Sequence, residues 1–201
     1  MAEPELYFEE ASRYLNEALM EETLRALSPV RREKALKMKL QSAKRLSVAA
    51  GHLMDTVLAR KGINPERVIY GKYGRPELPG NLLYFSLSHQ NGTAALAVSE
   101  KPVGVDIEFV QDKKYSDSIV RRFYFPAEKE ALSRTADFDA KLRLFFRMWT
   151  VKEAYGKLCG TGIKDALKMD SVNPFKSVCF SYPSCPMGKD YLVTVCMPQE
   201  A

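Results

Sequence analysis

The spacing of apolar residues divides this chain into helices and short strands. Apolar side chains that recur every three or four residues predict helices, and alternation of apolar and polar residues predicts strands. The expected helices cover residues 14–27, 29–39, 43–60, 118–123, 126–134 and 138–158. The expected strands cover residues 6–8, 68–70, 82–88, 93–99, 103–109, 177–182 and 191–197. Because helices and hairpins do not alternate as βαβ units, the pattern favours the α+β class.

Local signals fix the ends of several elements. Ser28 and Pro29 stand at the N-cap and first helical positions of the helix expected over 29–39. Gln90-Asn91-Gly92 separates two β-type runs, which is a strong hairpin signal. Both halves thus place helices before antiparallel strands. We expect two α+β subdomains, residues 1–101 and 102–201.

The strand expected over 103–109 has two different faces. Its apolar residues share one face, whereas Gly104, Asp106 and Glu108 fall on the other. Residues two apart on a strand lie roughly 7 Å from each other, so both acids can hold one hard cation. An edge strand with a solvated polar face stays open as the alternative.

A third acid belongs to the longest expected helix. Helical spacing puts Trp149, Glu153 and Lys157 on one stripe, with Glu153 and Lys157 one turn apart. Together with the two strand carboxylates, this stripe favours a magnesium-assisted phosphate site. An ordinary surface ion pair between Glu153 and Lys157 is the alternative reading.

Composition and charge narrow the class of protein. The chain has 201 residues and 46% hydrophobic content, enough for a sizeable core, and no apolar run that spans a bilayer. We expect a soluble, cytoplasmic protein without a membrane partner. The net charge is +5, and basic residues crowd into 31–45. That cluster predicts an anionic partner, with a solvated helix face as the alternative.

Other site chemistries fit poorly. The four cysteines form no CxxC pair, so we expect reduced, mostly buried thiols and no transition-metal site. Ser88 and His89 are neighbours on a strand and point to opposite faces, and no G-x-S-x-G elbow is present, which excludes a serine hydrolase. A nucleic-acid module would use the basic cluster but leaves the three acids unexplained, so we expect no nucleic-acid partner.

Several segments together resemble a known family. They are Gly104-Val105-Asp106-Ile107-Glu108, Trp149-Thr150-Val151-Lys152-Glu153-Ala154-Tyr155-Gly156-Lys157, Tyr70-Gly71 through Pro76, and Phe85-Ser86-Leu87-Ser88-His89. In these motifs the chain resembles the 4′-phosphopantetheinyl transferases of the surfactin-synthetase-activating type. The resemblance runs from Leu27 to about Lys157 and fades towards both ends.

The resemblance implies an enzyme that moves the phosphopantetheine arm of coenzyme A to a serine hydroxyl of an acidic acyl or peptidyl carrier protein. It implies that adenosine 3′,5′-bisphosphate is released and that Mg²⁺ is the cofactor. It also implies a monomer whose fold consists of two similar α+β subdomains in a pseudo-twofold arrangement. A catalytically degenerate domain of the same fold, binding coenzyme A or a nucleotide, is the alternative. Carrier docking is expected at basic residues after the carboxylate strand, namely Lys113, Lys114, Arg121 and Arg122.

The resemblance also assigns residues. The implied magnesium ligands are Asp106, Glu108 and Glu153, and the implied catalytic residues are Glu153, Lys157, Lys152 and Glu128. Lys157 matches a pyrophosphate contact, Lys152 orients the reacting groups, and Glu128 serves as base or outer metal contact. The implied coenzyme A contacts are Arg31, Lys34, Arg75, Ser88, His89 and Lys157. Arg75 departs from the lysine more usual at its position, which changes the donor geometry there.

Overall fold

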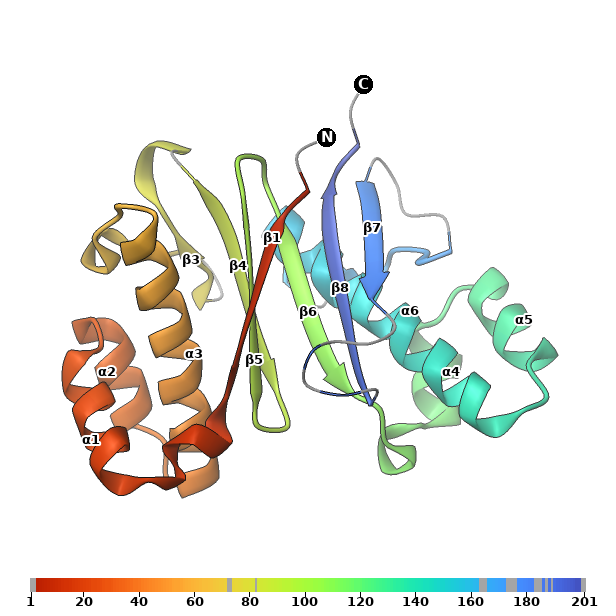
Figure 1. Ribbon diagram of the computed structural model, residues 1–201. Helices are drawn as coiled ribbons and strands as arrows, with labels where there is room; N and C mark the ends of the chain where they lie inside the picture. The colour runs from red at the N-terminus through yellow and green to blue at the C-terminus, as the bar shows by residue number, and fades with distance from the viewer. Residues whose placement is uncertain are drawn as a thin grey trace. The chain divides into compact units, whose positions relative to one another are not determined.

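The computed structural model describes two compact units, Met1–Glu100 and Lys101–Ala201, each built from helices and an antiparallel sheet (Figure 1). The α+β class is therefore confirmed. No helix in the described part of the chain is both long and apolar enough to cross a membrane. The residues described are 3–71, 74–81, 83–162, 166–172, 177–182, 186, 188 and 190–199.

The first unit packs helices against a three-stranded sheet of order β1-β5-β4. Its strands are β1 (Glu5–Glu10), β4 (Tyr84–Gln90) and β5 (Thr93–Ser99), with a separate short pair, β2 (Ile69–Tyr70) and β3 (Pro76–Glu77). Its helices are α1 (Glu17–Ala26), α2 (Pro29–Leu36) and α3 (Gln41–Arg60), and its 3₁₀ turns are η1 (Ala11–Leu15), η2 (Pro65–Arg67) and η4 (Pro79–Asn81).

Burial and turn chemistry explain this unit. Apolar residues of α3, among them Met54 and Leu58, pack with Phe85 and Leu96 of the sheet in one buried cluster. Asn91 and Gly92 have positive φ, 45° and 85°, as the tight hairpin between β4 and β5 requires. The predicted Asn-Gly hairpin is thus confirmed. The first strand is longer than expected, and Leu82, predicted to begin a strand, lies outside the described residues.

The second unit contains a sheet of order β6-β8-β7, with α6 packed against β6 and β8 (Figure 1). Its strands are β6 (Gly104–Phe109), β7 (Ser177–Tyr182) and β8 (Tyr191–Pro198). Its helices are α4 (Asp117–Phe123), α5 (Pro126–Arg134) and α6 (Phe138–Cys159), preceded by the 3₁₀ turn η5 (Asp112–Lys114). Asp137 caps α6 by accepting from Ala140 N at 2.7 Å, and Gly160 ends it at a φ of 67°.

The two units repeat one order of connection. Apart from the short β2–β3 pair of the first unit, each has a first strand, then helices and then two antiparallel strands, the last of which lies in the middle of the sheet. The carboxylate strand β6 is hydrogen-bonded to β8 and belongs to the second sheet. Ser88 and His89 lie on β4, which belongs to the sheet of the first unit.

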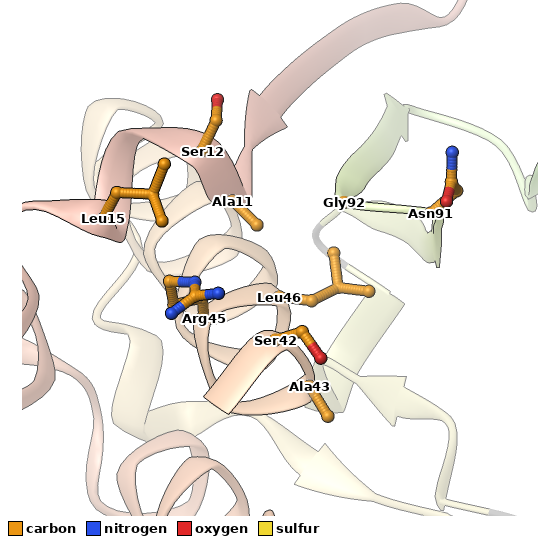
Figure 2. Close-up of a pocket in the computed structure, with 9 residues that line it drawn as sticks. All are labelled: Ala11, Ser12, Leu15, Ser42, Ala43, Arg45, Leu46, Asn91 and Gly92. Carbon is orange, nitrogen blue, oxygen red and sulfur yellow. The ribbon is translucent and has the colours of Figure 1, made fainter. Parts of the chain in front are cut away.

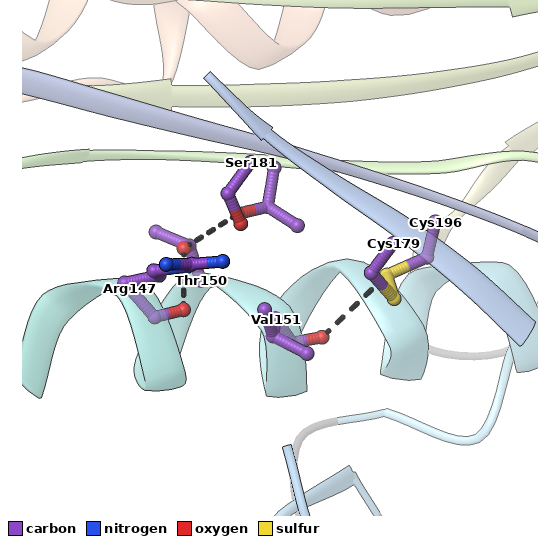
Figure 3. The surroundings of a disulfide bond; sticks show 7 residues. Arg147, Thr150, Val151, Cys179, Ser181 and Cys196 are labelled. Atoms are coloured by element: carbon purple, nitrogen blue, oxygen red, sulfur yellow. Dashed lines mark hydrogen bonds between the residues drawn. A yellow bond between two sulfur atoms is a disulfide. The ribbon is translucent and has the colours of Figure 1, made fainter. Parts of the chain in front are cut away.

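The prediction that all cysteines are reduced and mostly buried is wrong. Cys179 of β7 lies directly opposite Cys196 of β8, and the two form a disulfide (Figure 3). Cys159 is free and exposed, and Cys185 lies outside the described residues. The two bonded cysteines are 17 positions apart in the sequence. Only the strand register brings them together, which a search for short cysteine motifs does not detect.

Candidate active site

A close approach between strand β6 and helix α6 creates the site in the second unit. A Cβ on Gly104 would lie 2.0 Å from the carbonyl oxygen of Ala154 and 2.5 Å from the amide nitrogen of Leu158. Only glycine therefore lets the strand touch the helix backbone. Because Gly104 shares its face with Asp106 and Glu108, this contact puts Glu153 and Lys157 beside the strand carboxylates.

Both strand carboxylates are largely buried and engaged by lysines. Asp106 is 5% exposed, and its Oδ1 accepts from Lys157 Nζ at 2.8 Å. Glu108 Oε2 accepts from Lys114 Nζ at 3.1 Å. The alternative of a solvated polar face on an edge strand is therefore wrong, although β6 does lie at the edge of its sheet. Lys157 of α6 bonds to Asp106 of the strand, so its role is not limited to an ion pair with Glu153 on its own helix.

The charges of both strand acids affect the pKa of Glu153. Burial, and next the charge of Asp106, raise the pKa of Glu153 from 4.5 to about 7; the charge of Glu108 acts in the same direction, and Lys157 opposes it. Without a cation, this carboxyl is thus only partly ionised near neutral pH. The second unit brings together Asp106, Glu108, Glu153 and Lys157 as the sequence predicted.

Whether these acids suit a metal ion depends on their chemistry and their arrangement. Three carboxylates are the oxygen donors that a hard cation such as Mg²⁺ takes, and a cation would relieve the repulsion that adds to burial in raising the pKa of Glu153. In their present arrangement, no three His, Cys, Asp or Glu side chains of the described residues form a ready metal site. The donor set fits in kind, and metal binding stays a prediction.

Glu128 and Lys152 form a separate buried ion pair. Both side chains have 0% exposure, and Lys152 Nζ lies 2.9 Å from Glu128 Oε1. Glu128 also accepts from Phe125 N at 2.6 Å and from Ser171 N at 2.8 Å, and Lys152 donates to the carbonyl of Met169. Burial lowers the pKa of Lys152 despite its acidic partner. The pair ties α5, α6 and the segment around residue 170 together, and neither group is open to a substrate.

In the first unit, helix α2 carries two predicted coenzyme residues in different surroundings. Arg31 is only 2% exposed, and its Nη2 donates to Ser47 O at 3.3 Å. Its buried Nε has no hydrogen-bond partner among the described residues. Lys34 as a whole residue is exposed, but its ammonium group is partly desolvated. This desolvation, together with the charge of Arg31, lowers the pKa of Lys34. This end of the unit is therefore strongly cationic.

The other predicted coenzyme residues lie on β4 and next to β3. Ser88 is buried and its neighbour His89 is exposed, which confirms that they point to opposite faces of the strand. Arg75 Nε lies 3.6 Å from Glu77 Oε1. Arg31, Lys34, Arg75, Ser88 and His89 all belong to the first unit, whereas every predicted metal ligand belongs to the second.

Two cavities add residues that the sequence did not indicate. A cavity of about 440 Å³ in the first unit is drawn in Figure 2, where Arg45 lies among small and apolar side chains; it is lined by Ala11, Ser12, Leu15, Ser42, Ala43, Arg45, Leu46, Asn91 and Gly92. A cavity of about 200 Å³ adjoins one strand acid, Glu108, and is otherwise lined by Lys114, Ile119, Phe145, Phe146 and Trp149. Lys114, predicted only for carrier docking, thus lines this cavity beside the acid cluster.

Comparisons with known proteins point to one family. A family model described as the 4′-phosphopantetheinyl transferase superfamily matches residues 102–182. The chain is 34% identical to the 4′-phosphopantetheinyl transferase HetI of Nostoc sp. over 127 residues, which cover 60% of this chain and 53% of HetI. It is 28% identical to the transferase Sfp of Bacillus subtilis over 151 residues, which cover 72% of this chain and 64% of Sfp. The chain thus spans between half and two thirds of these two relatives.

A third relative is covered more fully. The 4′-phosphopantetheinyl transferase AcpT of Salmonella typhi is 31% identical over 137 residues, which cover 67% of this chain and 69% of AcpT. With this coverage, and with the motif acids of β6 and α6 placed side by side, the chain belongs to the 4′-phosphopantetheinyl transferase family.

Proposed function

We propose that this protein transfers the 4′-phosphopantetheine arm of coenzyme A to a serine hydroxyl of an apo carrier protein, releasing adenosine 3′,5′-bisphosphate. We assign it to the surfactin-synthetase-activating type within the family. The observation that carries the proposal is the mutual influence of Asp106, Glu108 and Glu153, three acids crowded beside a lysine. Such crowding is costly unless a cation joins the acids.

Asp106, Glu108 and Glu153 would hold Mg²⁺, which when bound supplies positive charge that neutralises the pyrophosphate of coenzyme A. Lys157 and Lys114 already lie against two of these acids. In the proposed reaction, the Lys157 ammonium turns towards the pyrophosphate and stabilises the charge that builds on the departing phosphate. The chain thereby acts by positioning and electrostatics, with little covalent chemistry of its own.

The coenzyme would be held by the first unit. Arg31 and Lys34 supply the positive charge expected for a 3′-phosphate, and the buried Arg31 Nε is a donor that a phosphate oxygen would satisfy. Arg75, Ser88 and His89 would contact the adenosine and its phosphates. The Glu128–Lys152 pair is assigned a positioning role, because two fully buried groups cannot reach a substrate without moving.

The carrier is proposed to be an acidic acyl or peptidyl carrier protein. Two basic residues end helix α4, Arg121 and Arg122, both of which are exposed. With Lys113 and Lys114 they give the second unit a cationic surface near the carboxylate strand. Complementary charge steers such a partner and makes its association sensitive to salt.

A transfer assay tests the whole proposal. The protein is incubated with coenzyme A and a panel of apo carriers, with Mg²⁺ or with a chelator, and the carriers are weighed by mass spectrometry. We expect one carrier to gain a phosphopantetheine group only when Mg²⁺ is present, and Asp106→Asn to remove most of the activity. Glu130→Gln, which changes an exposed acid on α5, is the matched control. Coenzyme A binding without transfer to any carrier would instead indicate the catalytically degenerate domain.

A further inference from the structure

The first turn of helix α2 is held by a carboxylate from α3. Ser28 occupies the N-cap position as predicted, but its hydroxyl makes no capping bond to the helix. Instead Asp55 Oδ2 accepts from Ser28 N at 2.7 Å, and Asp55 Oδ1 accepts from Ser28 Oγ at 3.2 Å. A side chain 27 residues away therefore fixes the start of the basic helix.

Arg31 of α2 packs against the face of α3 that carries Asp55. Ser47, Gly51 and Asp55 follow each other at intervals of four residues, so they lie on one face of the helix. Arg31 Nη2 bonds to Ser47 O, and a Cβ on Gly51 would lie 3.2 Å from Arg31 Nε. The guanidinium thus rests in a slot that the missing side chain of Gly51 opens, and Asp55 anchors the chain three residues before it.

We propose that Asp55 is a positioning residue for coenzyme recognition. By holding Ser28, it fixes the rotation and height of α2 on α3, and so the direction in which Arg31 Nε and the Lys34 ammonium are presented. A buried guanidinium nitrogen with no partner among the described residues is costly, and it gains most from an anionic oxygen at one defined place. This inference rests on the proposed function of α2 in binding the 3′-phosphate of coenzyme A.

The test compares coenzyme A with 3′-dephospho-coenzyme A, which lacks only that phosphate. Asp55→Ala should raise KM for coenzyme A about 5- to 10-fold, a part of the roughly 10- to 100-fold that losing a charge-assisted contact costs. KM for the dephospho substrate should change less than about 2-fold, because that substrate lacks the phosphate that makes the contact. The value of kcat should also change less than about 2-fold, because the contact is remote from the reacting atoms. Asp55→Asn, which keeps one acceptor, should shift the ratio of KM values in the same direction by a smaller factor.

Two further variants separate positioning from general stability. Asn16→Ala removes the cap of α1, whose side chain accepts from Leu19 N at 3.0 Å, and should lower the melting temperature without changing the ratio of KM values. In the background of Lys34→Ala, the effect of Asp55→Ala on that ratio should shrink, because both changes act on one contact. If Asp55→Ala does not fold, Asp55→Asn decides on the same readout.

The outcomes distinguish the two levels of inference. If wild-type protein does not prefer coenzyme A over the dephospho form, the proposed phosphate site on α2 is wrong and the role of Asp55 falls with it. If wild-type protein shows the preference and Lys34→Ala removes it, but the folded Asp55 variants keep the wild-type ratio, the positioning role alone is overturned. The positioning role would also be overturned if Asp55→Ala and Asn16→Ala changed the ratio of the two KM values by the same factor.

Discussion

Replacing Glu153 by glutamine should change how the metal-free protein responds to pH. Because the folded pKa of Glu153 is raised to about 7 from an ordinary 4.5, its protonated form stabilises the folded state. That contribution is fully present at low pH and is lost as pH rises through about 7. At 1.36 kcal/mol per pKa unit, the raised pKa lowers the free energy of unfolding by about 1 kcal/mol near pH 5 and about 3 kcal/mol near pH 8.5, relative to low pH. Between these two pH values, wild-type protein should therefore lose about 2 kcal/mol of stability that Glu153→Gln retains.

The assay is unfolding by urea in a chelating buffer at both pH values. Each variant is compared with wild type at the same pH, so that contributions from all other groups cancel. Glu130→Gln, at an exposed ion pair with Arg134, is the control and should follow wild type. Adding Mg²⁺ at high pH should restore the stability of wild type more than that of Glu153→Gln. Parallel pH curves for wild type and Glu153→Gln would show that this carboxyl does not lie in an acidic cluster, and the reasoning would fail.

Three other changes test the second unit. Gly104→Ala should cost about 3 kcal/mol or more in urea unfolding and abolish transfer, because the new methyl group overlaps the backbone of α6; unchanged stability would contradict the close contact. Lys152→Met alone should cost about 3–5 kcal/mol by leaving Glu128 charged and buried, whereas adding Glu128→Gln should recover part of that loss; simple additivity would refute their pairing. Cys179→Ala should cost about 2–4 kcal/mol and make the melting temperature insensitive to reductant; alkylation of the unreduced protein should label two cysteines fewer than after reduction.

The elements that the sequence predicted well are those whose information is local. The Asn91-Gly92 turn requires two positive φ values, and few residue pairs supply them. The period of their apolar residues predicts the long helices. Gly160 ends α6 in the left-handed conformation expected for a glycine. The motif acids were found in the same way, since strand and helix periods assign Asp106 and Glu153 to defined faces.

What the sequence could not give depends on contacts between distant segments. Ser28 carries a correct local capping signal, yet its partner is Asp55 on another helix, which no spacing rule connects. The bond between Cys179 and Cys196 follows from strand register, and register is set by the whole sheet. The family resemblance assigned Glu128 and Lys152 to the site, and only tertiary packing pairs them with each other in the core. In each case a local pattern identified the residue and only the fold identified its partner.

Packing by small residues, and not attraction between charges, holds the acid cluster together. Gly104 stands two residues before Asp106 and touches the helix backbone at Ala154, the neighbour of Glu153. Gly156, next to Lys157, is also confined, because a Cβ there would lie 2.6 Å from the side chain of Ala166. Because the contact at Gly104 holds the helix against the strand, the carboxylates stay near each other even when they repel, and this repulsion adds to burial in raising the pKa of Glu153. This packing fixes the backbone on which the acids stand, whereas the acid side chains of the described residues do not form a ready metal site in this arrangement and would have to turn towards a cation.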